Sequence, residues 1–235
     1  MRIAVIGAHG FVGSAIAKAI EHDERHELIC VVRGDDIKSK LGSADVVIHA
    51  ANPARRFRAE SDPVRDFVET VDKTFNILSL AIGKKCLLIS SLSCKTQLNT
   101  NYGRNRRFCE LLALAQGAVV VRLGPMFGRE RKQDVLHDLL ADKQIYVSSE
   151  TRYAYVNVEW VGANILELLD AQSDIYEIGA KNSVSLSELR DILGSKSIFN
   201  GVDDTQIPLT EGDGPDAMLV VEYALNELAG ADNWK

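Results

Sequence analysis

The sequence predicts an α/β fold in which a parallel sheet of about six strands is covered by helices on both faces. Three features carry this prediction: short continuous runs of Val, Ile and Leu, amphipathic stretches between them, and a glycine-rich turn after the first run. Continuous apolar strands that alternate with helices are typical of a doubly wound parallel sheet. The expected strands are Ile3–Ile6, Leu28–Val32, Val46–His49, Leu87–Ser90, Val119–Leu123 and Asp174–Ile178.

The stretches between these strands have helical patterns, with one exception. Long helices are expected at Val64–Ile82, Tyr102–Ala115 and Glu159–Leu169, and a shorter one at Phe11–Ile20. Only residues 33–45 separate the second strand from the third, whereas a parallel crossover normally carries a packed helix. At best one short helical turn fits there, so one βα unit of the usual sheet is expected to be trimmed.

Composition narrows the class of protein. The 235 residues carry a net charge of −6, which argues against a nucleic-acid-binding face. No run approaches the roughly 20 apolar residues of a membrane span, and the N-terminus has the pattern of a strand, not of a signal peptide. The four cysteines form no CxxC pair, so reduced, partly buried thiols are favoured over a metal or disulfide role. We therefore expect a cytoplasmic protein without a metal site.

A glycine-rich motif joins the first strand to the first helix. It spans Gly7 to Gly13, with glycine at positions 7, 10 and 13. Gly7 permits the tight turn, Gly10 lets a pyrophosphate approach the backbone, and Gly13 allows close helix–strand packing. The helix that opens at Phe11 and Val12 supplies N–H donors and positive potential. The motif predicts a nicotinamide dinucleotide site on a Rossmann-like sheet.

The ends of the second and third strands would complete that site. Small residues at Ala50 and Ala51, followed by Asn52, let a dinucleotide lie against the backbone. After the second strand, Arg33 lies at a position where an arginine accommodates the 2′-phosphate of NADP. NADP is therefore favoured, although Asp35 or Asp36 would favour NAD by binding ribose hydroxyls.

A serine and a tyrosine follow at positions suited to acid–base chemistry. Ser91 lies at the end of the fourth strand and Tyr102 opens the next helix. Tyrosine has a reference pKa of about 10, so it needs a nearby cation to transfer protons near neutral pH. Arg106 lies four residues on, one helical turn away on the same face.

These motifs, in this order, resemble the NAD-dependent epimerase/dehydratase branch of the extended short-chain dehydrogenase/reductase superfamily, whose members act on nucleotide sugars. The motif from Gly7 to Gly13 is similar to its GxxGxxG, and Asp45–Ala51 to its DVVIHAA strand. Further similar segments are Thr74–Leu78 (TxNLL), Ile89–Ser91 (the catalytic Ser/Thr strand), Tyr102 (YxxxK), Arg122–Gly128 (RPGxxYG), Val156–Glu159 (VHVxD), Tyr176–Gly179 (YNIG) and Ser185–Glu188 (TLSEL).

The resemblance implies roles and also exposes departures. It implies that Ser91 and Tyr102 are catalytic and that Asp36 and Ile37 lie beside the adenine. The family lysine that holds the nicotinamide ribose is Arg106 here, which keeps the charge on a longer, forked side chain. Thr70 stands where an asparagine is usual, and Asn157 and Trp160 replace a histidine and an acidic residue.

Two functions stay open at this stage. The favoured one is an NAD(P)-dependent nucleotide-sugar oxidoreductase or epimerase, with Ser91, Tyr102 and Arg106 as catalytic residues. The alternative is a catalytically silent NAD(P)-binding sensor or accessory module. The chain is expected to form one domain over 1–235, with a small substrate lobe from 129–152 and 180–235. The long helices at Val64–Ile82 and Tyr102–Ala115 resemble the dimer helices of the family, so a homodimer is expected.

Several other residues have less decisive patterns. His9 is expected to contribute only its backbone, and His49 to be a packed neutral histidine. Glu110 is expected to form a structural salt bridge. The basic cluster Arg55–Arg58 is either a solvated loop or a contact to a substrate diphosphate.

Overall fold

The computed structural model describes residues 1–129, 131, 133–209 and 214–232, and the chain forms two compact units. The first comprises Met1–Leu123 and Glu159–Glu177, and the second Gly124–Val158 and Ile178–Lys235. The expected lobe of 129–152 and 180–235 falls within the second unit, and its residues 130, 132, 210–213 and 233–235 lie outside the described residues. Among the described helices, none has the length and apolar character needed to span a bilayer.

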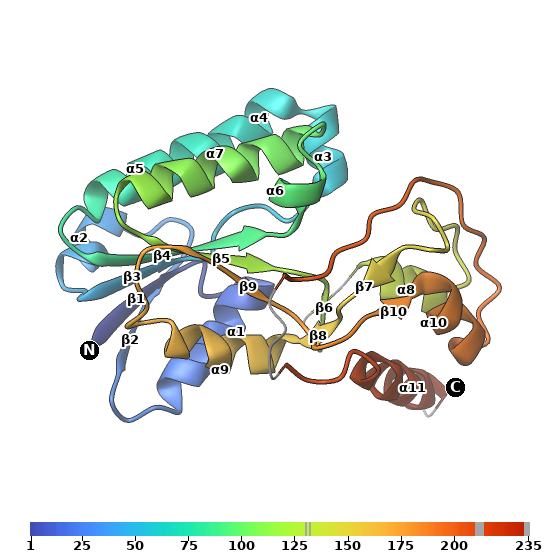
Figure 1. Cartoon of the computed structure of the whole chain (residues 1–235). Coiled ribbons are helices and arrows are strands. Elements are labelled where there is room, and N and C mark those ends of the chain that lie inside the picture. The colour runs from blue at the N-terminus through green and yellow to red at the C-terminus, as the bar shows by residue number, and fades with distance from the viewer. Residues whose placement is uncertain (130, 132, 210–213, 233–235) are drawn as a thin grey trace. The chain divides into compact units, whose positions relative to one another are not determined.

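The first unit is built on a six-stranded sheet with the order β2-β1-β3-β4-β5-β9 (Figure 1). The pairings among its first five strands are all parallel. This confirms the predicted doubly wound α/β sheet, including two strands whose predicted and observed bounds agree. The strands are β1 (Arg2–Ile6), β2 (Glu27–Val31), β3 (Val46–His49), β4 (Lys85–Ser91), β5 (Val119–Leu123) and β9 (Ile175–Ile178).

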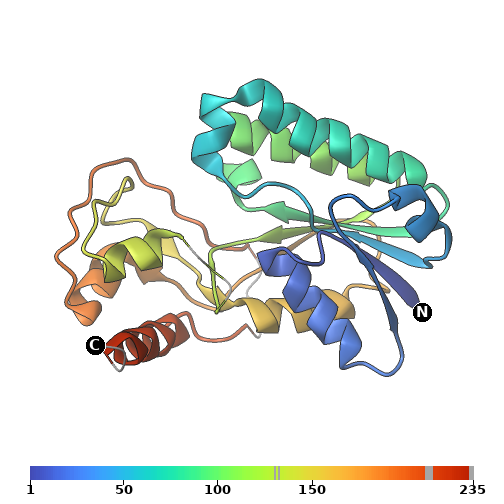
Figure 2. The same ribbon diagram turned by 180° about the vertical axis from the view of Figure 1, so that it is seen from behind.

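Helices cover both faces of this sheet. On one face lie α5 (Lys73–Leu80) and α7 (Asn101–Ala115), and on the other α1 (Phe11–Glu21) and α9 (Val158–Glu167), as Figures 1 and 2 show. Strand side chains alternate between the faces, which is why nearly every strand position is apolar. Ala4, Ile6, Val47, Leu88 and Val120, for example, belong to the buried cluster that includes side chains of α5 and α7.

The helix expected over Val64–Ile82 is not uniform. It consists of α4 (Pro63–Phe67), a π-helical turn η1 (Val68–Asp72) and α5. Asp62 begins it by accepting a hydrogen bond from the backbone N–H of Arg65, at 3.2 Å. A π turn is a local widening of an α-helix and often occurs at functional sites. The periodicity predicted the helix correctly but gave no sign of this turn.

The connection between β2 and β3 and the Arg55–Arg58 cluster each contain a short helix. Between β2 and β3 the chain forms only α2 (Ile37–Gly42), which agrees with the expected single short helical turn. The Arg55–Arg58 cluster does not form a loop: from Arg56 it belongs to a short helix, α3 (Arg56–Ser61). A further short helix, α6 (Ser93–Thr96), precedes α7.

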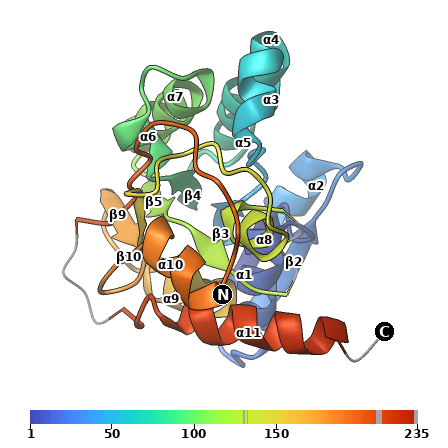
Figure 3. The ribbon, with the colours of Figure 1, turned by 90° about the vertical axis from the view of Figure 1, so that its right-hand side faces the viewer.

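The second unit has its own core and its own short strands. Strand β6 (Met126–Phe127) pairs in parallel with β8 (Val156–Asn157), and β7 (Arg152–Tyr153) pairs antiparallel with β10 (Val184–Ser185). Its helices are α8 (Val135–Leu140), α10 (Leu186–Leu193) and α11 (Leu219–Asp232), which Figure 3 shows near one another. Side chains of all three helices share one buried cluster. The helix residues of this cluster include Leu136, Leu139, Leu186, Leu189, Val220 and Ala224.

Candidate functional site

The glycine-rich turn after β1 is closely packed against the end of β3. Gly7 has a φ of +88°, and a Cβ there would lie 2.9 Å from Cα of Ala51. A Cβ on Gly13 would lie 2.0 Å from the carbonyl oxygen of Gly7. Any larger residue at Gly13 would therefore force the turn and α1 apart.

The N-terminus of α1 is open to an anion. Gly10 is its N-cap residue, no side chain caps it, and its first turn contains no acidic residue. Phe11 and Val12 begin the helix, and both are partly buried. The positive end of the helix dipole is thus not neutralised by the helix's own side chains.

After β2, Arg33 and the two acidic residues that follow it differ in their hydrogen bonding. Asp35 accepts hydrogen bonds from the backbone N–H of Val32 (2.8 Å) and from Nζ of Lys40 (2.7 Å), and the Lys40 contact chiefly lowers the pKa of Asp35. Asp36 is the N-cap of α2, before Ile37, and accepts from the backbone N–H of Ser39. Arg33 is exposed and has no hydrogen bond to a described residue.

The end of β3 carries Ala50, Ala51 and Asn52, all partly buried. Lys73, the first residue of α5, donates from Nζ to the carbonyl oxygen of Ala51 at 3.0 Å. The side-chain amide of Asn52 contacts Oγ1 of Thr74, one residue further along α5. Two of the dinucleotide-binding residues expected at this strand end, Ala51 and Asn52, therefore contact α5.

His49 is buried at the end of β3. Its Nε2 contacts Oγ1 of Thr74 at 3.1 Å, and its Nδ1 accepts from the backbone N–H of Ala51 at 3.3 Å. Burial lowers the pKa of His49 to about 3, and the nearby charges of Lys73 and Arg106 act in the same direction. The side chain is therefore neutral at pH 7, as the sequence predicted.

Tyr102 and Arg106 lie together in the first turns of α7. Thr100 caps this helix by accepting from the backbone N–H of Gly103 at 3.0 Å. The two side chains are almost completely buried, with 7% and 4% exposed, and Cζ of Arg106 lies 5.0 Å from the centroid of the Tyr102 ring. Nη2 of Arg106 donates to the carbonyl oxygen of Pro53. Its Nε is buried without a hydrogen-bond partner among the described residues.

Ser91 ends β4, the strand next to β3, and is only partly buried. Its Oγ accepts from the backbone N–H of Ser93 at 3.2 Å and contacts Oγ of Ser93 at 3.3 Å. Ser90 is buried instead and donates to Oε1 of Glu110 at 2.7 Å. Alternation along the strand thus gives the two neighbouring serines different environments.

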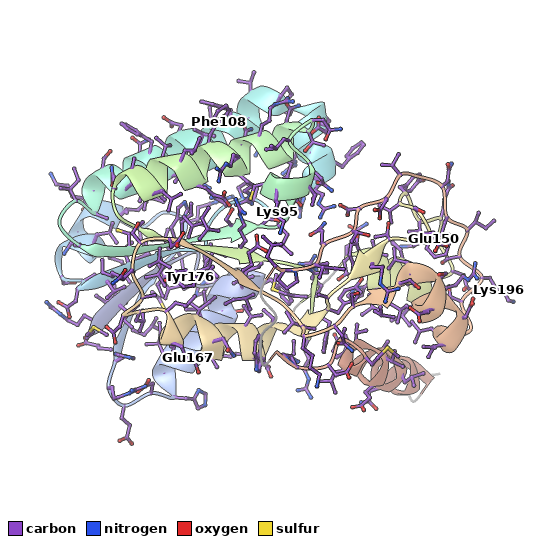
Figure 4. The ribbon with its side chains drawn as sticks, viewed as in Figure 1. Lys95, Phe108, Glu150, Glu167, Tyr176 and Lys196 are labelled. Carbon is purple, nitrogen blue, oxygen red and sulfur yellow. The ribbon has the colours of Figure 1, made fainter. Side chains whose placement is uncertain are left out.

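Glu110 forms the salt bridge that the sequence predicted, at the centre of a buried network. Arg122 of β5 donates to both of its carboxylate oxygens, at 2.7 and 2.9 Å, and Arg107 donates at 2.9 Å. Burial alone would raise the pKa of Glu110, but the hydrogen bonds that it accepts lower it. Arg122 also contacts Glu177, which pairs with Lys95 (labelled in Figure 4).

The contact of Lys73 was not predicted from the sequence, and Thr70 was recognised there only as standing where an asparagine is usual. Lys73 directly precedes the Thr74–Leu78 motif, but its contact with Ala51 depends on where the helix lies. Thr70, in the π turn, is 1% exposed, and its Oγ1 has no partner among the described residues. For Lys73 the only available signal was the type of residue at one helical position.

Comparison with known proteins places these features in a family. The model of the NAD dependent epimerase/dehydratase family matches residues 3–141. This chain belongs to that family. A search of curated protein sequences gave no match. NAD or NADP is the cofactor typical of the family, and the closely packed Gly7 and Gly13 and the uncapped α1 fit such a dinucleotide.

Solved structures resemble the whole chain at low sequence identity. The Pal protein of Bacillus thuringiensis is 16% identical with a TM-score of 0.79, covering 97% of this chain and 100% of that one. UDP-glucuronic acid 4-epimerase of Bacillus cereus is 18% identical, with a TM-score of 0.75 and coverages of 95% and 93%. UDP-glucose 4-epimerase of Thermotoga maritima is 17% identical, with a TM-score of 0.74 and coverages of 97% and 100%. At these identities the likeness shows a shared fold.

Proposed function

We propose that this family member is an NAD(P)-dependent oxidoreductase or epimerase whose substrate is a nucleotide sugar. The Bacillus cereus epimerase named above was solved with UDP-glucuronic acid and NAD, and the Thermotoga maritima epimerase with UDP-glucose. A nucleotide sugar is therefore the substrate class that the similar folds support.

Four cysteines without disulfides support a cytoplasmic location.

The observation that carries this proposal is the pairing of Tyr102 with Arg106. A cation 5.0 Å from the ring centroid can stabilise the negative charge that Tyr102 gains when it gives up its proton. Tyr102 would transfer a proton to or from the sugar hydroxyl, and Ser91 would hydrogen-bond the same oxygen. The nicotinamide, when bound, supplies the hydride acceptor or donor.

Arg106 has an additional role in this proposal. Its unpartnered Nε is a buried donor, and a buried donor without an acceptor costs roughly 1–3 kcal/mol. A ribose hydroxyl of the dinucleotide would be a suitable acceptor. Arg106 would then hold the nicotinamide ribose, the role that the resemblance gives to a lysine.

A panel of nucleotide sugars tests the function. Each sugar is incubated with the protein and either dinucleotide, while nicotinamide absorbance and product chromatography are followed. Both readouts are needed because an epimerase returns its hydride and shows no net change in absorbance.

The second candidate function is a dinucleotide-binding module without turnover. It is favoured by one contact: Nη2 of Arg106 donates to the carbonyl oxygen of Pro53, which commits part of the guanidinium to the backbone. Displacement of a catalytic group by about 1 Å can cost on the order of a hundredfold in rate. Both candidates share the dinucleotide and differ in conversion of the sugar.

We expect NADP to bind more tightly than NAD. Asp35 and Asp36 are engaged with Lys40 and Ser39, whereas Arg33 is exposed and available for a 2′-phosphate. A charge-assisted hydrogen bond contributes about 1.5–3 kcal/mol, which corresponds to roughly a ten- to hundredfold difference in affinity. Calorimetric titration with each dinucleotide measures this ratio. Tighter binding of NAD would contradict the preference and implicate an acidic residue instead.

We also propose that the protein is a homodimer. Large apolar side chains are exposed on η1, α5 and α7, and Phe108 lies on the side of α7 turned away from the sheet (Figure 4). Phe75 and Leu111 are about equally exposed. Such surface is typical of an interface between subunits. Light scattering should give the mass of a dimer, and Phe108→Glu should shift it toward the monomer; a monomeric parent across micromolar concentrations would contradict the proposal.

A further inference from the structure

Lys73 is a half-buried cation without a carboxylate partner among the described residues. Its Nζ donates to the carbonyl oxygen of Ala51. The nearby carboxylate of Glu69 bonds instead to Nε of Arg65, at 2.8 Å. By contrast, Lys40 and Lys95 both form ion pairs with carboxylates. The charge of Lys73 is thus not neutralised by a direct contact.

Two further cations act on Lys73. Burial lowers its pKa, Glu69 opposes that change, and Arg106 and Arg33 lower the pKa further. Arg106 is also without a carboxylate partner among the described side chains, and its buried Nε has no acceptor. Arg106 and Arg33 are thus near enough to act on the charge of Lys73, and the carboxylate that opposes them there, Glu69, is itself paired with Arg65. Like charges held together in this way attract an anion.

The strand order places Lys73 beside the dinucleotide turn. Gly7 donates its backbone N–H to the carbonyl oxygen of Val31 at 2.9 Å, two residues before Arg33. On its other side Gly7 packs against Ala51, the residue whose carbonyl receives Lys73. Arg33 therefore follows β2, and Lys73 of α5 contacts the residue group that follows β3; β2 and β3 are the two neighbours of β1.

We propose that Lys73 binds the 2′-phosphate of NADP together with Arg33. This inference rests on the proposed dinucleotide function and adds a second phosphate-binding side chain to it. The pyrophosphate of the dinucleotide has its own binding position at the N-terminus of α1, where backbone N–H groups serve it. The 2′-phosphate carries up to two negative charges, and two cations match it better than Arg33 alone. Lys73 can turn from the Ala51 carbonyl because its stem is flexible and its ammonium donates in three directions.

Lys84 provides a matched control. Its Nζ donates to the carbonyl oxygen of Ala44 at 2.6 Å, and the side chain is also partly buried. Ala44 precedes β3, whereas Ala51 follows it. Lys84→Gln therefore removes the same kind of contact at the opposite end of the same strand.

The probes are 2′,5′-ADP, which carries the 2′-phosphate without a pyrophosphate, and 5′-AMP, which carries neither. We expect Lys73→Gln to weaken binding of 2′,5′-ADP and NADP about ten- to hundredfold, with 5′-AMP and NAD affected less than about threefold. Lys84→Gln should leave all four dissociation constants within about twofold of the parent. Equal loss of NADP and NAD affinity in Lys73→Gln, or no loss at all, would overturn the proposal.

Amine acetylation of the parent, followed by mass spectrometry, gives a second test that does not depend on folding of a variant. We expect 2′,5′-ADP to protect Lys73 but not Lys84, and 5′-AMP to protect neither. Equal protection of Lys73 by both nucleotides would overturn the proposal. If the proposed dinucleotide function is wrong, the parent protein binds neither NADP nor NAD. That result differs from the failure of the Lys73 proposal, in which the parent still binds a dinucleotide.

Discussion

Tyr102→Phe is expected to lower the rate of nucleotide-sugar conversion by about 10²- to 10⁴-fold, the usual contribution of a general acid–base residue. The substitution removes one hydroxyl from a ring that is 7% exposed and keeps the contact between that ring and the Arg106 guanidinium. The protein should therefore stay folded, and its affinity for the dinucleotide should stay within about twofold of the parent. Steady-state kinetics, with dinucleotide titration alongside, measure both effects.

A matched variant separates the role of the hydroxyl from general effects of losing a tyrosine. Tyr176 on β9 donates its hydroxyl to the carbonyl oxygen of Gln172, and the residue is labelled in Figure 4. Tyr176→Phe should retain the parental rate within about twofold. If Tyr102→Phe leaves a detected activity unchanged, the proposed proton transfer is wrong.

Glu110→Gln is expected to destabilise the first unit by about 3–5 kcal/mol, because it leaves the buried Arg122 without its principal anionic partner. Arg122 donates to both oxygens of a carboxylate that is 0% exposed, and Glu177 compensates at only one of its nitrogens. Urea unfolding at pH 7 measures the difference. The exposed helical pair Arg65–Glu69 is the control, and Glu69→Gln should change stability by less than about 1 kcal/mol. If Glu110→Gln also lowers stability by less than about 1 kcal/mol, Glu110 is not the stabilising partner of the buried Arg122.

The pH dependence of this effect has a defined sign. The pKa of Glu110 is lower in the folded protein than in the unfolded chain. Its charge therefore adds stability above the unfolded value of about 4.3. That contribution is lost as the pH falls through the lowered folded value. Urea unfolding from pH 7 downward should show the difference between parent and Glu110→Gln shrinking at acidic pH; a difference that grows there would contradict this.

The sheet of the first unit could be predicted because its strands are short, continuously apolar and separated by helical patterns. Strands β3 and β5 were predicted with their observed bounds, since Asp45 and Ala118 each precede a run of three Val or Ile residues. The glycine-rich turn was also readable, because only glycine fits the approaches seen at Gly7 and Gly13. The buried Glu110 pair was expected from the resemblance, because Glu110 matches an acidic residue often found in this helix.

The remaining features depend on tertiary packing. The two-residue strands of the second unit are too short to have an alternating pattern, and α11 packs through a few side chains such as Val220 and Ala224. The π turn around Thr70 leaves the apolar spacing of its helix nearly unchanged. The position of Lys73 against Ala51 joins residues 22 apart in sequence, which no local pattern specifies.

Conversion of a nucleotide sugar by the dinucleotide-loaded protein tests the central claim most directly. Product chromatography is applied to the parent, Tyr102→Phe and Arg106→Lys at matched dinucleotide occupancy, with UDP-glucose and UDP-glucuronic acid in the panel. The proposed enzyme predicts a product with the parent and its near-complete loss with Tyr102→Phe. A parent that binds the dinucleotide but forms no product, beside an Arg106→Lys variant that gains conversion at unchanged dinucleotide affinity, would contradict the claim and establish the binding module.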